Sequence, residues 1–548
     1  MIIMQKINNK AFDQLLKEYY SKIEKLSSEA NITYFNASIS GSENDYNEFE
    51  RLQLEINKLY SDKNLFQQFK DFKESGEITD DIKERELQLI YDKFAGNQFD
   101  ENLHKEIIKL STKIEKVYST FRAEVNGVKV TDNEINDILK SSTDTLKLKT
   151  TWCESKKVGK VVAKDLIELV KLRNKSANDL GYENYHDMSL KLNEQNSIAL
   201  DKLFDELDIL TKKSFAELKA EIDSQLSVKF KIDKRELMPR HYGNKYFMRG
   251  PDINNLNIDK YFEGQDIIKI TREYFNGINL NIDNLIEKSD LYEKDGKYQH
   301  AYCLDIDRSG DVRVVCNIKG NQYWMGTMLH EYGHAVYDKN VSQKLPWQLR
   351  TFSHVFTSEA IAMLFGRLAH NPEWLKEMNI ISEEVATKIE EPIFNSLRSD
   401  QLIFSRWVQV MYRFEKEMYS NPDQDLNELW WLLVEKYQLI KKPASRNKPD
   451  WASVIHIAIY PAYYHNYLLG ELLASQLNNY ITTKILHSEK NNNENFVGSV
   501  KVGDYLKHQF FYFGARYSWN KLIQRATGEE LTPRYYVEQF KYGTEHEL

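Results

Sequence analysis

The residues of this sequence best suited to chemistry are two histidines and a glutamate in the segment His330-Glu331-Tyr332-Gly333-His334. Histidines four residues apart project from one face of a helix, so both imidazoles can bind one metal ion. Glu331 follows the first histidine, where its carboxylate can hold a metal-bound water and accept its proton. The spacing predicts one Zn²⁺ ion on His330 and His334, with Glu331 as the catalytic base. The alternative is two surface histidines on a charged helix.

A catalytic zinc site needs a third protein ligand and leaves a fourth position for water. Between residues 335 and 372 the acidic residues are Asp338 and Glu359. Asp338 continues the motif helix by one turn, where it more readily caps the helix or faces solvent. Glu359 opens a new apolar helix, residues 360–368, that can pack opposite the first. We therefore favour Glu359 over Asp338 as the third metal ligand.

The elements that must hold these residues are predicted to be helices, so the fold class is all-α. The 548 residues include only 10 Pro and 22 Gly against 82 acidic and 74 basic residues, a balance that favours long uninterrupted helices. The motif itself lies in a helix predicted over about residues 321–340. Apolar residues also recur at spacings of three and four in residues 11–116, 158–180, 199–226, 382–417 and 464–485.

One segment directly before the motif departs from the helical pattern. Residues 300–318 contain two short stretches in which apolar residues alternate with other residues, separated by the turn-forming residues 307–311. The alternating residues are Tyr302, Leu304 and Ile306, then Val312, Val314 and Cys316. We predict a short antiparallel hairpin beside the zinc helix. The polar segment 488–495 is predicted to be a surface loop.

Charge and composition exclude several classes of function. The formal net charge of -8, with acidic and basic residues interspersed, offers no basic stripe for a phosphate backbone, so no nucleic-acid partner is expected. No apolar run approaches the length of a membrane span. The apolar stretch at the start of the chain is too short to be the hydrophobic core of a secretory signal peptide. Cys153, Cys303 and Cys316 show no paired spacing, which suits a reducing compartment. We expect a cytoplasmic monomer without a membrane partner.

The sequence resembles the angiotensin-converting-enzyme (peptidyl-dipeptidase A) family of zinc peptidases over nearly the whole chain. The similar segments are Ile32-Thr33-Tyr34, Asn178-Asp179-Leu180-Gly181-Tyr182, Glu287-Lys288-Ser289, residues 300–338, Ser358-Glu359-Ala360-Ile361 and residues 519–540. The zinc and base positions match residue by residue, although the spacer before Glu359 is one residue longer than usual. The thimet oligopeptidase and oligoendopeptidase families are similar more distantly. The resemblance implies a helical ellipsoid with a deep central groove, built over residues 1–548 as one zinc-peptidase unit with two helical lobes.

The resemblance also implies residues that act on the substrate. His456 and Tyr467 are similar to a histidine and a tyrosine that stabilise the tetrahedral oxyanion, as neutral donors aimed at charge that develops in the transition state. Tyr464 is similar to a substrate-binding residue. The interval from His456 to Tyr467 is one residue longer than usual, so Tyr463 and Tyr464 can exchange roles. From the residues alone, these tyrosines are equally well read as core aromatics at helical spacing.

His300 and Ala301 begin the predicted hairpin strand. Similar residues in the family lie along the substrate as an antiparallel edge, so the resemblance implies that both bind substrate. Without the resemblance, His300 would be read as an exposed residue at the end of a strand.

Two positions that hold the free C-terminal carboxylate of the peptide in the family differ here. A lysine two residues before His456 is replaced by Val454, and a glutamine in an earlier segment is replaced by Met248. Arg249, beside Met248, is a candidate replacement for the lost charge, and a surface arginine is the alternative reading. Release of C-terminal dipeptides is therefore not implied by these positions.

Two further departures concern the metal and chloride. Met363 stands where the family has a carboxylate one turn after the third ligand, which removes an acceptor for a zinc-bound histidine. Asp338 or a backbone carbonyl could replace it. A family arginine linked to chloride activation falls near Asn466, so chloride dependence is not expected.

Together these observations predict a zinc metallopeptidase that hydrolyses short peptides, with dipeptide release from the C-terminus as the activity that the resemblance implies. An oligoendopeptidase that cuts within small peptides is the alternative enzyme. A catalytically silent peptide-binding homologue is the alternative of another class, although such proteins typically lose a ligand or the base, and His330, Glu331, His334 and Glu359 are all present.

Overall fold

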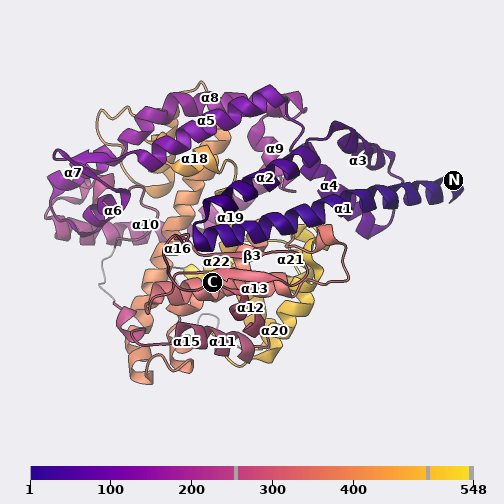
Figure 1. Ribbon diagram of the computed structural model, residues 1–548. Coiled ribbons are helices and arrows are strands. Elements are labelled where there is room, and N and C mark those ends of the chain that lie inside the picture. Colours follow the sequence, from indigo (N-terminus) through magenta and orange to yellow (C-terminus); the bar gives the residue numbers. More distant parts are fainter. Residues whose placement is uncertain (1, 252–256, 489–493, 542–548) are drawn as a thin grey trace.

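The computed structural model describes residues 2–251, 257–488 and 494–541 and is almost entirely helical (Figure 1). The predicted all-α class is confirmed. The first half of the chain contains α1 (Ile2–Ser40), α2 (Glu43–Tyr60), α3 (Lys63–Ser75), α4 (Asp81–Ala95), α5 (Glu101–Thr120), β1 (Ala123–Val125), β2 (Val128–Val130), α6 (Asp132–Ser141), α7 (Thr145–Ser155), α8 (Lys157–Asp179), α9 (Tyr185–Leu192), α10 (Ser197–Phe230), α11 (Ile267–Gly277) and α12 (Asp283–Lys288).

The second half carries the motif. It contains β3 (Tyr302–Asp305), β4 (Val312–Val315), α13 (Gln322–Lys339), α14 (Val355–Gly366), α15 (Pro372–Glu377), α16 (Glu383–Ser420), α17 (Leu426–Leu433), α18 (Ile455–Ile459), α19 (His465–Tyr480), α20 (Val500–Tyr505), α21 (Trp519–Thr527) and α22 (Arg534–Phe540). Short 3₁₀ turns lie at Lys234–Glu236, Pro239–His241, Asp259–Tyr261, Trp347–Leu349, Arg367–His370, Trp451–Ser453 and Phe511–Arg516, and π-helical turns at Val434–Gln438, Ile481–Ile485 and Leu506–Phe510.

Side-chain caps explain where many of these helices begin. An Asp, Asn or Ser side chain commonly accepts a hydrogen bond from a backbone N–H of the first turn, which would otherwise lack a partner. Asn321 caps α13 by accepting from Trp324 N at 3.0 Å, and Ser382 caps α16 through Val385 N at 3.3 Å. The predicted helix at 321–340 therefore begins and ends where expected, with Asn321 and Asn340 flanking it.

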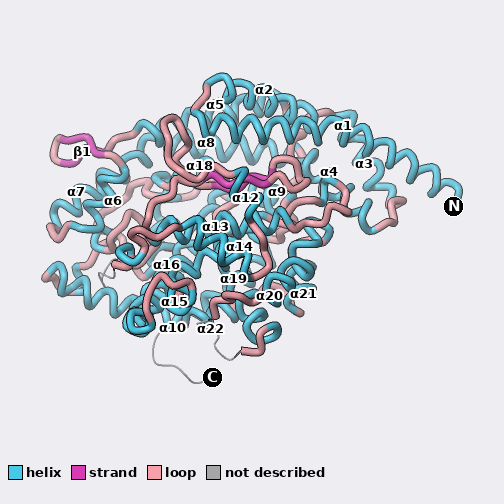
Figure 2. The backbone as a smooth tube through the Cα atoms, turned by 60° about the horizontal axis from the view of Figure 1, so that its bottom comes forward, coloured by secondary structure: helices cyan, strands magenta, loops and turns pink. Residues whose placement is uncertain are grey.

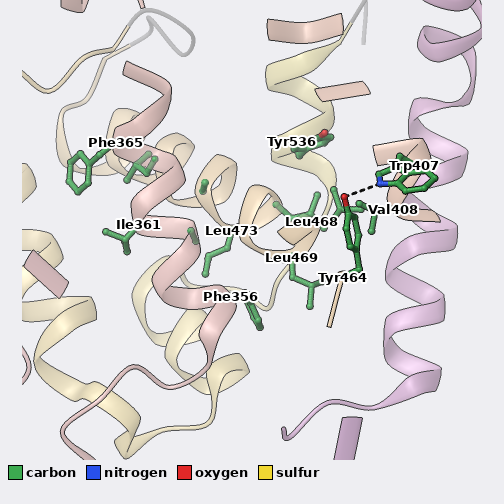
Figure 3. Close-up of a cluster of buried hydrophobic side chains, with 14 of the residues drawn as sticks. Phe356, Ile361, Phe365, Trp407, Val408, Tyr464, Leu468, Leu469, Leu473 and Tyr536 are labelled. Carbon is green, nitrogen blue, oxygen red and sulfur yellow. Dashed lines mark hydrogen bonds between the residues drawn. The ribbon is translucent and has the colours of Figure 1, made fainter. Parts of the chain in front are cut away.

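The core that supports the motif is formed where α13 packs on α14 and α14 packs on α19. Figure 3 shows the side chains that fill this region: Phe356, Ile361 and Phe365 from α14, and Leu468, Leu469 and Leu473 from α19. All six are fully buried or nearly so. A smaller core cluster joins α1, α3 and α4 and includes Trp347. Burial of apolar surface on this scale is what holds helices of low intrinsic stability in place.

Two glycines allow unusually close helix packing in this core. A Cβ at Gly333, inside the motif, would lie 2.8 Å from Cα of Ala362 on α14. A Cβ at Gly470, on α19, would lie 3.2 Å from Sδ of Met363 and 3.3 Å from Cβ of Glu359. The absence of a side chain at both positions lets the backbones of α13, α14 and α19 approach each other directly.

The predicted hairpin before the motif is confirmed as β3 and β4, which pair antiparallel with Tyr302 opposite Val315. It lies between α1 and α13 (Figures 1 and 2). The strand is shorter than predicted, because it begins at Tyr302 and leaves His300 and Ala301 just ahead of it.

A second hairpin, β1 and β2, was not predicted and lies at one end of the molecule (Figure 2). Its turn is Asn126-Gly127, and both residues have positive φ (54° and 81°). Asn-Gly is the strongest short-range sequence signal for a two-residue hairpin turn. The signal was present in the sequence between Val125 and Val128.

Other predictions on the elements need correction or stay untested. The helix predicted at 360–368 begins earlier, at Val355, because His354 Nδ1 accepts a hydrogen bond from Phe356 N and caps α14 there. Most of the polar segment 488–495 lies outside the described residues. The two-lobe organisation and the deep groove stay predictions. Within the described ranges, no helix combines the length and the apolar character that a membrane span requires.

We predict that Gly333→Ala destabilises the fold, because the new methyl group must push α13 away from the α14 backbone. Overpacking of this kind typically costs about 1–3 kcal/mol of unfolding free energy. Gly326→Ala on the same helix is the matched control, since its Cβ would meet its nearest neighbour at an ordinary 3.5 Å. Urea unfolding of both metal-free variants measures the difference. Equal stability of the two variants would contradict the packing argument.

Candidate metal and catalytic site

The structure brings His330, His334 and Glu359 together, although they come from two helices. Nε2 of His330 lies 3.7 Å from Oε2 of Glu359, and Nε2 of His334 lies 3.9 Å from the same oxygen. One ligand atom from each residue falls within 4.8 Å of the other two, so the three side chains could hold one metal ion. Glu359 sits in the second turn of α14, directly against α19 at Gly470.

His334 is oriented by a residue that the sequence reasoning missed. Its Nδ1 lies 2.8 Å from Oγ of Ser358, which is buried and directly precedes Glu359. The hydrogen bond leaves Nε2 of His334 facing Glu359. Because Met363 replaces the family's carboxylate, Asp338 or a backbone carbonyl was considered as the hydrogen-bond partner of a metal-binding histidine. In the structure the partner of His334 is instead the hydroxyl of Ser358.

Asp338 lies apart from the group formed by His330, His334 and Glu359, which we call the metal-ligand set because it could hold one ion. Its carboxylate interacts electrostatically with Asp305 on β3 and with Arg308 in the hairpin turn, and burial raises its pKa well above the usual value. The side chain therefore faces the hairpin. Of the two acidic residues weighed as third ligand, only Glu359 lies with the histidines.

Burial changes the protonation of the groups around this site. Desolvation, together with the negative charge of Glu359, raises the pKa of Glu331 to about 8. Desolvation and the nearby Glu471 raise the pKa of Glu359 to about 7. Desolvation lowers the pKa of His330 to about 4, so its imidazole is neutral near pH 7 and can act as a metal ligand.

An aromatic cluster connects Glu359 to His456. Glu359 raises the pKa of both Tyr467 and Tyr463, after the larger effect of burial, so both rings lie near the acidic end of the site. Tyr467 packs edge-on against Tyr464 with ring centroids 5.4 Å apart, and Tyr464 packs edge-on against His456 at 5.0 Å. The structure therefore gathers His456, Tyr464 and Tyr467 in one cluster, and adds Tyr463 to it.

Tyr463 and Tyr464, which the sequence left interchangeable, have different surroundings. The hydroxyl of Tyr464 accepts a hydrogen bond of 2.9 Å from Nε1 of Trp407 on α16 (Figure 3), and the residue is almost fully buried. Tyr463 instead lies near Glu359 and packs against Tyr467 at 5.4 Å. The Tyr464 hydroxyl is thus engaged by Trp407, whereas Tyr463 lies near Glu359.

Buried polar groups hold the segment between α18 and α19 that carries these tyrosines. Glu415 of α16 accepts a hydrogen bond of 2.7 Å from the backbone N–H of Ala462, whose φ is 53°. Arg173 of α8 donates to the carbonyl of Ala458 at 2.8 Å. Nε2 of Gln195 donates to Oδ1 of Asn466 at 2.8 Å. Asn466, which stands near the position of the family arginine linked to chloride, therefore has a structural role here.

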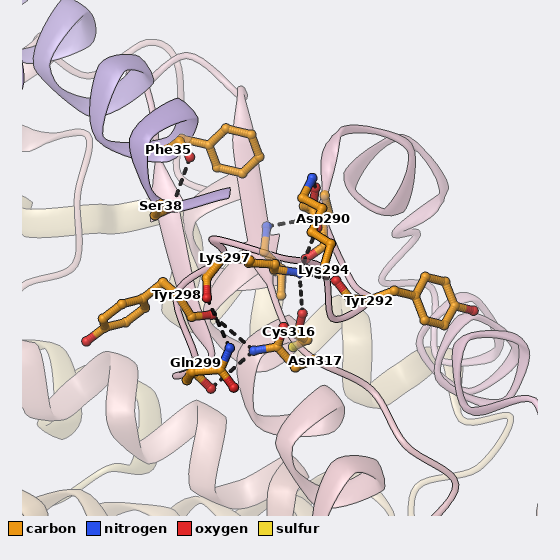
Figure 4. Close-up of polar contacts among 12 residues, drawn as sticks. Phe35, Ser38, Asp290, Tyr292, Lys294, Lys297, Tyr298, Gln299, Cys316 and Asn317 are labelled. Atoms are coloured by element: carbon orange, nitrogen blue, oxygen red, sulfur yellow. Dashed lines mark hydrogen bonds and ion pairs between the residues drawn. The ribbon is translucent and has the colours of Figure 1, made fainter. Parts of the chain in front are cut away.

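His300 and Ala301 follow a tightly held loop. The side chain of Lys297 is completely buried, and its Nζ donates to Oδ1 of Asp290 at 2.6 Å and to the carbonyl of Cys316 at 2.5 Å (Figure 4). Nδ2 of Asn317 donates to the carbonyls of Tyr298 and Gln299, both at 3.1 Å. These contacts fix the backbone immediately before His300. His300 itself is exposed, and its ring packs on that of Tyr298 at 5.4 Å.

Met248 and Val454 line a cavity of about 530 Å³ that also borders His456 and Tyr464. Met248 and Val454, which replace a glutamine and a lysine of the family, therefore line the same cavity. Arg249, the candidate replacement cation, is exposed and does not line this cavity.

Sequence comparison relates the chain to known proteins. A family model described as angiotensin-converting enzyme, peptidase M2, matches residues 6–540. Carboxypeptidase 1 of Bacillus subtilis (strain 168) is 24% identical over 263 residues, which cover 44% of this chain and 51% of the relative.

Two further relatives are less similar to this chain. Thermostable carboxypeptidase 1 of Pyrococcus furiosus is 22% identical over 255 residues, 42% of this chain and 50% of the relative. Angiotensin-converting enzyme of Rattus norvegicus is 21% identical over 339 residues, 54% of this chain and 25% of the relative. The chain thus spans about half the length of the two carboxypeptidases and a quarter of the rat enzyme. Because the family model covers nearly all of it, the chain belongs to the angiotensin-converting enzyme family.

Proposed function

We propose that this protein is a zinc-dependent metallopeptidase that hydrolyses short peptides. The observation that carries the proposal is the convergence of His330, His334 and Glu359 beside Glu331, a buried carboxylate that serves as no ligand in this set. Catalytic zinc sites typically combine three protein ligands with an open position, and the carboxylate next to the first histidine is placed to act on water there. Membership of the family supports the peptide as substrate.

The donor set fits a single zinc ion. Two zinc bonds of about 2.1 Å at a tetrahedral angle place the bound atoms about 3.4 Å apart. The observed separations of 3.7 and 3.9 Å between histidine nitrogens and the glutamate oxygen are close to that value. The hydrogen bond between Nδ1 of His334 and Oγ of Ser358 favours Nε2 as the ligand atom, because Nδ1 then carries the proton and donates it to the serine oxygen. A bound zinc ion would supply Lewis-acid chemistry for polarising a peptide carbonyl and acidifying water.

The remaining chemistry comes from the chain's own residues. Glu331 accepts the proton of the attacking water and passes it to the leaving amine. A cation bound beside it would favour the ionised carboxylate that this role requires. His456 and Tyr467 donate hydrogen bonds to the developing oxyanion. Burial lowers the pKa of His456 and raises that of Tyr467 to about 12, so both are neutral donors near pH 7.

Substrate binding involves the edge of the interior hairpin and the aromatic cluster. β3 pairs with β4 on one side and, among the described strands, with none on the other. An extended peptide can therefore align beside His300 and Ala301 through main-chain hydrogen bonds. The ring of Tyr464 forms a wall of the neighbouring cavity. We further propose that the protein works as a cytoplasmic monomer.

The similarity to two carboxypeptidases supports release of residues from the C-terminus of a peptide as the form of peptidase activity. Cleavage within short peptides is the second candidate, because neither Met248 nor Val454 can pair with a terminal carboxylate.

The first test of this function is Glu331→Gln. The variant should keep zinc, because Glu331 is not a ligand, and should lose about 10²–10⁴-fold or more in kcat/KM, the usual contribution of a general base. Turnover of a quenched fluorescent peptide and the zinc content of the same sample are measured together. Near-normal turnover by the zinc-loaded variant would remove Glu331 from this role. Chelation should abolish wild-type turnover, and added zinc should restore it.

A second prediction separates the two candidate third ligands. Glu359→Ala should lower zinc affinity by more than the roughly 10–100-fold typical of groups outside the metal's ligand set. Asp338→Ala, a matched loss of one buried carboxylate, should leave zinc affinity nearly unchanged because that side chain faces the hairpin. Competition with a chromogenic chelator measures both affinities. The reverse order would reassign the third ligand to Asp338.

A third prediction concerns Ser358. Ser358→Ala should weaken zinc binding by about 10–100-fold, because the His334 ring loses the hydrogen bond that orients it. Ser353→Ala is the control, since this buried serine lies at the same end of α14 and contacts Thr357 at 3.4 Å rather than His334. The Co²⁺-substituted proteins should show a changed visible spectrum only for Ser358→Ala. Identical metal affinity and spectra in both variants would show that the hydroxyl does not orient His334.

A further inference from the structure

The face of α14 that packs on α19 carries three residues spaced four apart: Glu359, Met363 and Arg367. Residues at this spacing lie on one side of a helix. A Cβ at Gly470 of α19 would lie 3.3 Å from Cβ of Glu359 and 3.2 Å from Sδ of Met363. Arg367, which follows the last residue of α14 with a helical backbone, pairs with Glu471, the residue after Gly470. Glu359 and this ion pair therefore lie along the same contact between two helices.

Glu471 is a nearly buried carboxylate whose two oxygens both have partners. The exposed fractions of the Glu471 and Arg367 side chains are 12% and 11%. Oε2 accepts a charge-assisted hydrogen bond from Nη2 of Arg367, and Oε1 accepts one of 3.1 Å from Nε2 of Gln401 on α16. The hydroxyl of Tyr536 donates to Oε1 of Gln401 at 3.1 Å, which turns the amide so that its nitrogen faces Glu471. The carboxylate is therefore held in one place.

His330 lies beside the same end of α14. A Cβ at Gly366 would lie 3.4 Å from Cβ of His330 and 3.7 Å from its Nδ1. Arg367 follows Gly366 directly, so it is attached next to the backbone that contacts His330. Without a partner, this arginine would add an uncompensated positive charge near the metal-ligand set, and like charges repel more strongly where water is excluded.

The charge of Glu471 acts on two members of the metal-ligand set. It raises the pKa of Glu359, after the larger effect of burial, and it opposes the lowering of the pKa of His330 by burial. Both effects are those of a negative charge that favours positive charge on its neighbours. A metal ion on these two side chains is positive in the same place, so the Glu471 carboxylate stabilises it in the same way.

We propose that Glu471 is a positioning residue of the metal site: its carboxylate, fixed by Arg367 and Gln401, neutralises the arginine and stabilises the cation that the metal-ligand set would hold. The inference rests on the zinc site of the proposed function and adds a residue outside its ligands. Because the same ion pair also joins α14 to α19, charge and packing need separate variants.

Two variants break the ion pair but leave opposite charges. Glu471→Gln leaves an unpaired arginine and should weaken zinc binding by about 10–100-fold, the usual effect of a group outside the metal's ligand set. Arg367→Gln leaves an unpaired carboxylate, and its zinc affinity should equal or exceed that of the wild type. Competition with a chromogenic chelator measures both affinities. Equal losses in the two variants, as expected for a pair that only joins two helices, or unchanged affinity in Glu471→Gln, would overturn the proposal.

A returned charge tests the same role by rescue. In the Glu471→Gln background, Met363→Asp places a carboxylate on the same face of α14, one turn before Arg367. Zinc affinity should then recover most of its loss, because the arginine regains a negative neighbour. Met363→Asn in that background has nearly the same shape without the charge and should recover none. Equal zinc affinities of these two double variants would contradict the role of charge.

Glu194→Gln is the matched control for loss of one carboxylate from a nearly buried pair. Glu194 pairs with Arg85, with exposed side-chain fractions of 19% and 10%, and this pair joins α4 to the segment after α9. Its zinc affinity should stay that of the wild type. A loss in Glu194→Gln as large as that in Glu471→Gln would contradict the assignment. Thermal unfolding of each metal-free variant confirms that it is folded.

Zinc binding separates this inference from the proposed function, because the affinities are measured without substrate. A zinc affinity that depends on the charge of Glu471 supports the inference even if the wild type cleaves no peptide, a result that would refute the proposed function alone. Wild-type cleavage together with tight zinc binding by Glu471→Gln would refute the inference alone. A wild type that binds no zinc would refute both.

Discussion

The direct contact between α13 and α14 at Gly333 is the constraint on which the site depends. The two helices supply all three members of the metal-ligand set, and a methyl group at Gly333 would lie 2.8 Å from the α14 backbone. Gly470 allows α19 the same close approach to Glu359, and α19 carries Tyr467. Because Gly333 and Gly470 have no side chains, α13, α14 and α19 pack closely enough for their residues to surround one site. The buried apolar residues between α14 and α19 hold the helices in this position.

This packing places two acids in a region of low polarity. The pKa of Glu331 is about 8, whereas an unfolded glutamate titrates near about 4.3. In the metal-free protein the folded state therefore binds more protons between these values, and its stability from this group falls as the pH rises through that interval. A divalent cation favours the ionised form of nearby acids and would offset this cost. The burial of Glu331 therefore makes the metal-free protein less stable as the pH rises toward 8.

Much of the site was predictable because its parts are local in sequence. His330, Glu331 and His334 share one helix face, and the helix caps at Asn321 where its sequence suggests. Glu359 was favoured over Asp338 because it belongs to a separate apolar helix, and Glu359 is the one that lies close to the two histidines. The Asn126-Gly127 hairpin was equally local but was not predicted; each of its two strands is three residues long.

The sequence by itself determined the helical class, the hairpin before the motif and the identity of the chemical groups, since these depend on residue types at fixed short spacings. Tertiary structure alone decided that Ser358 contacts His334, that Tyr464 is bonded to Trp407, and that Met248 and Val454 line one cavity. These relations join residues up to more than two hundred positions apart, and no local pattern encodes them. They arise from how closely the helices pack, which depends on the fit of many side chains at once.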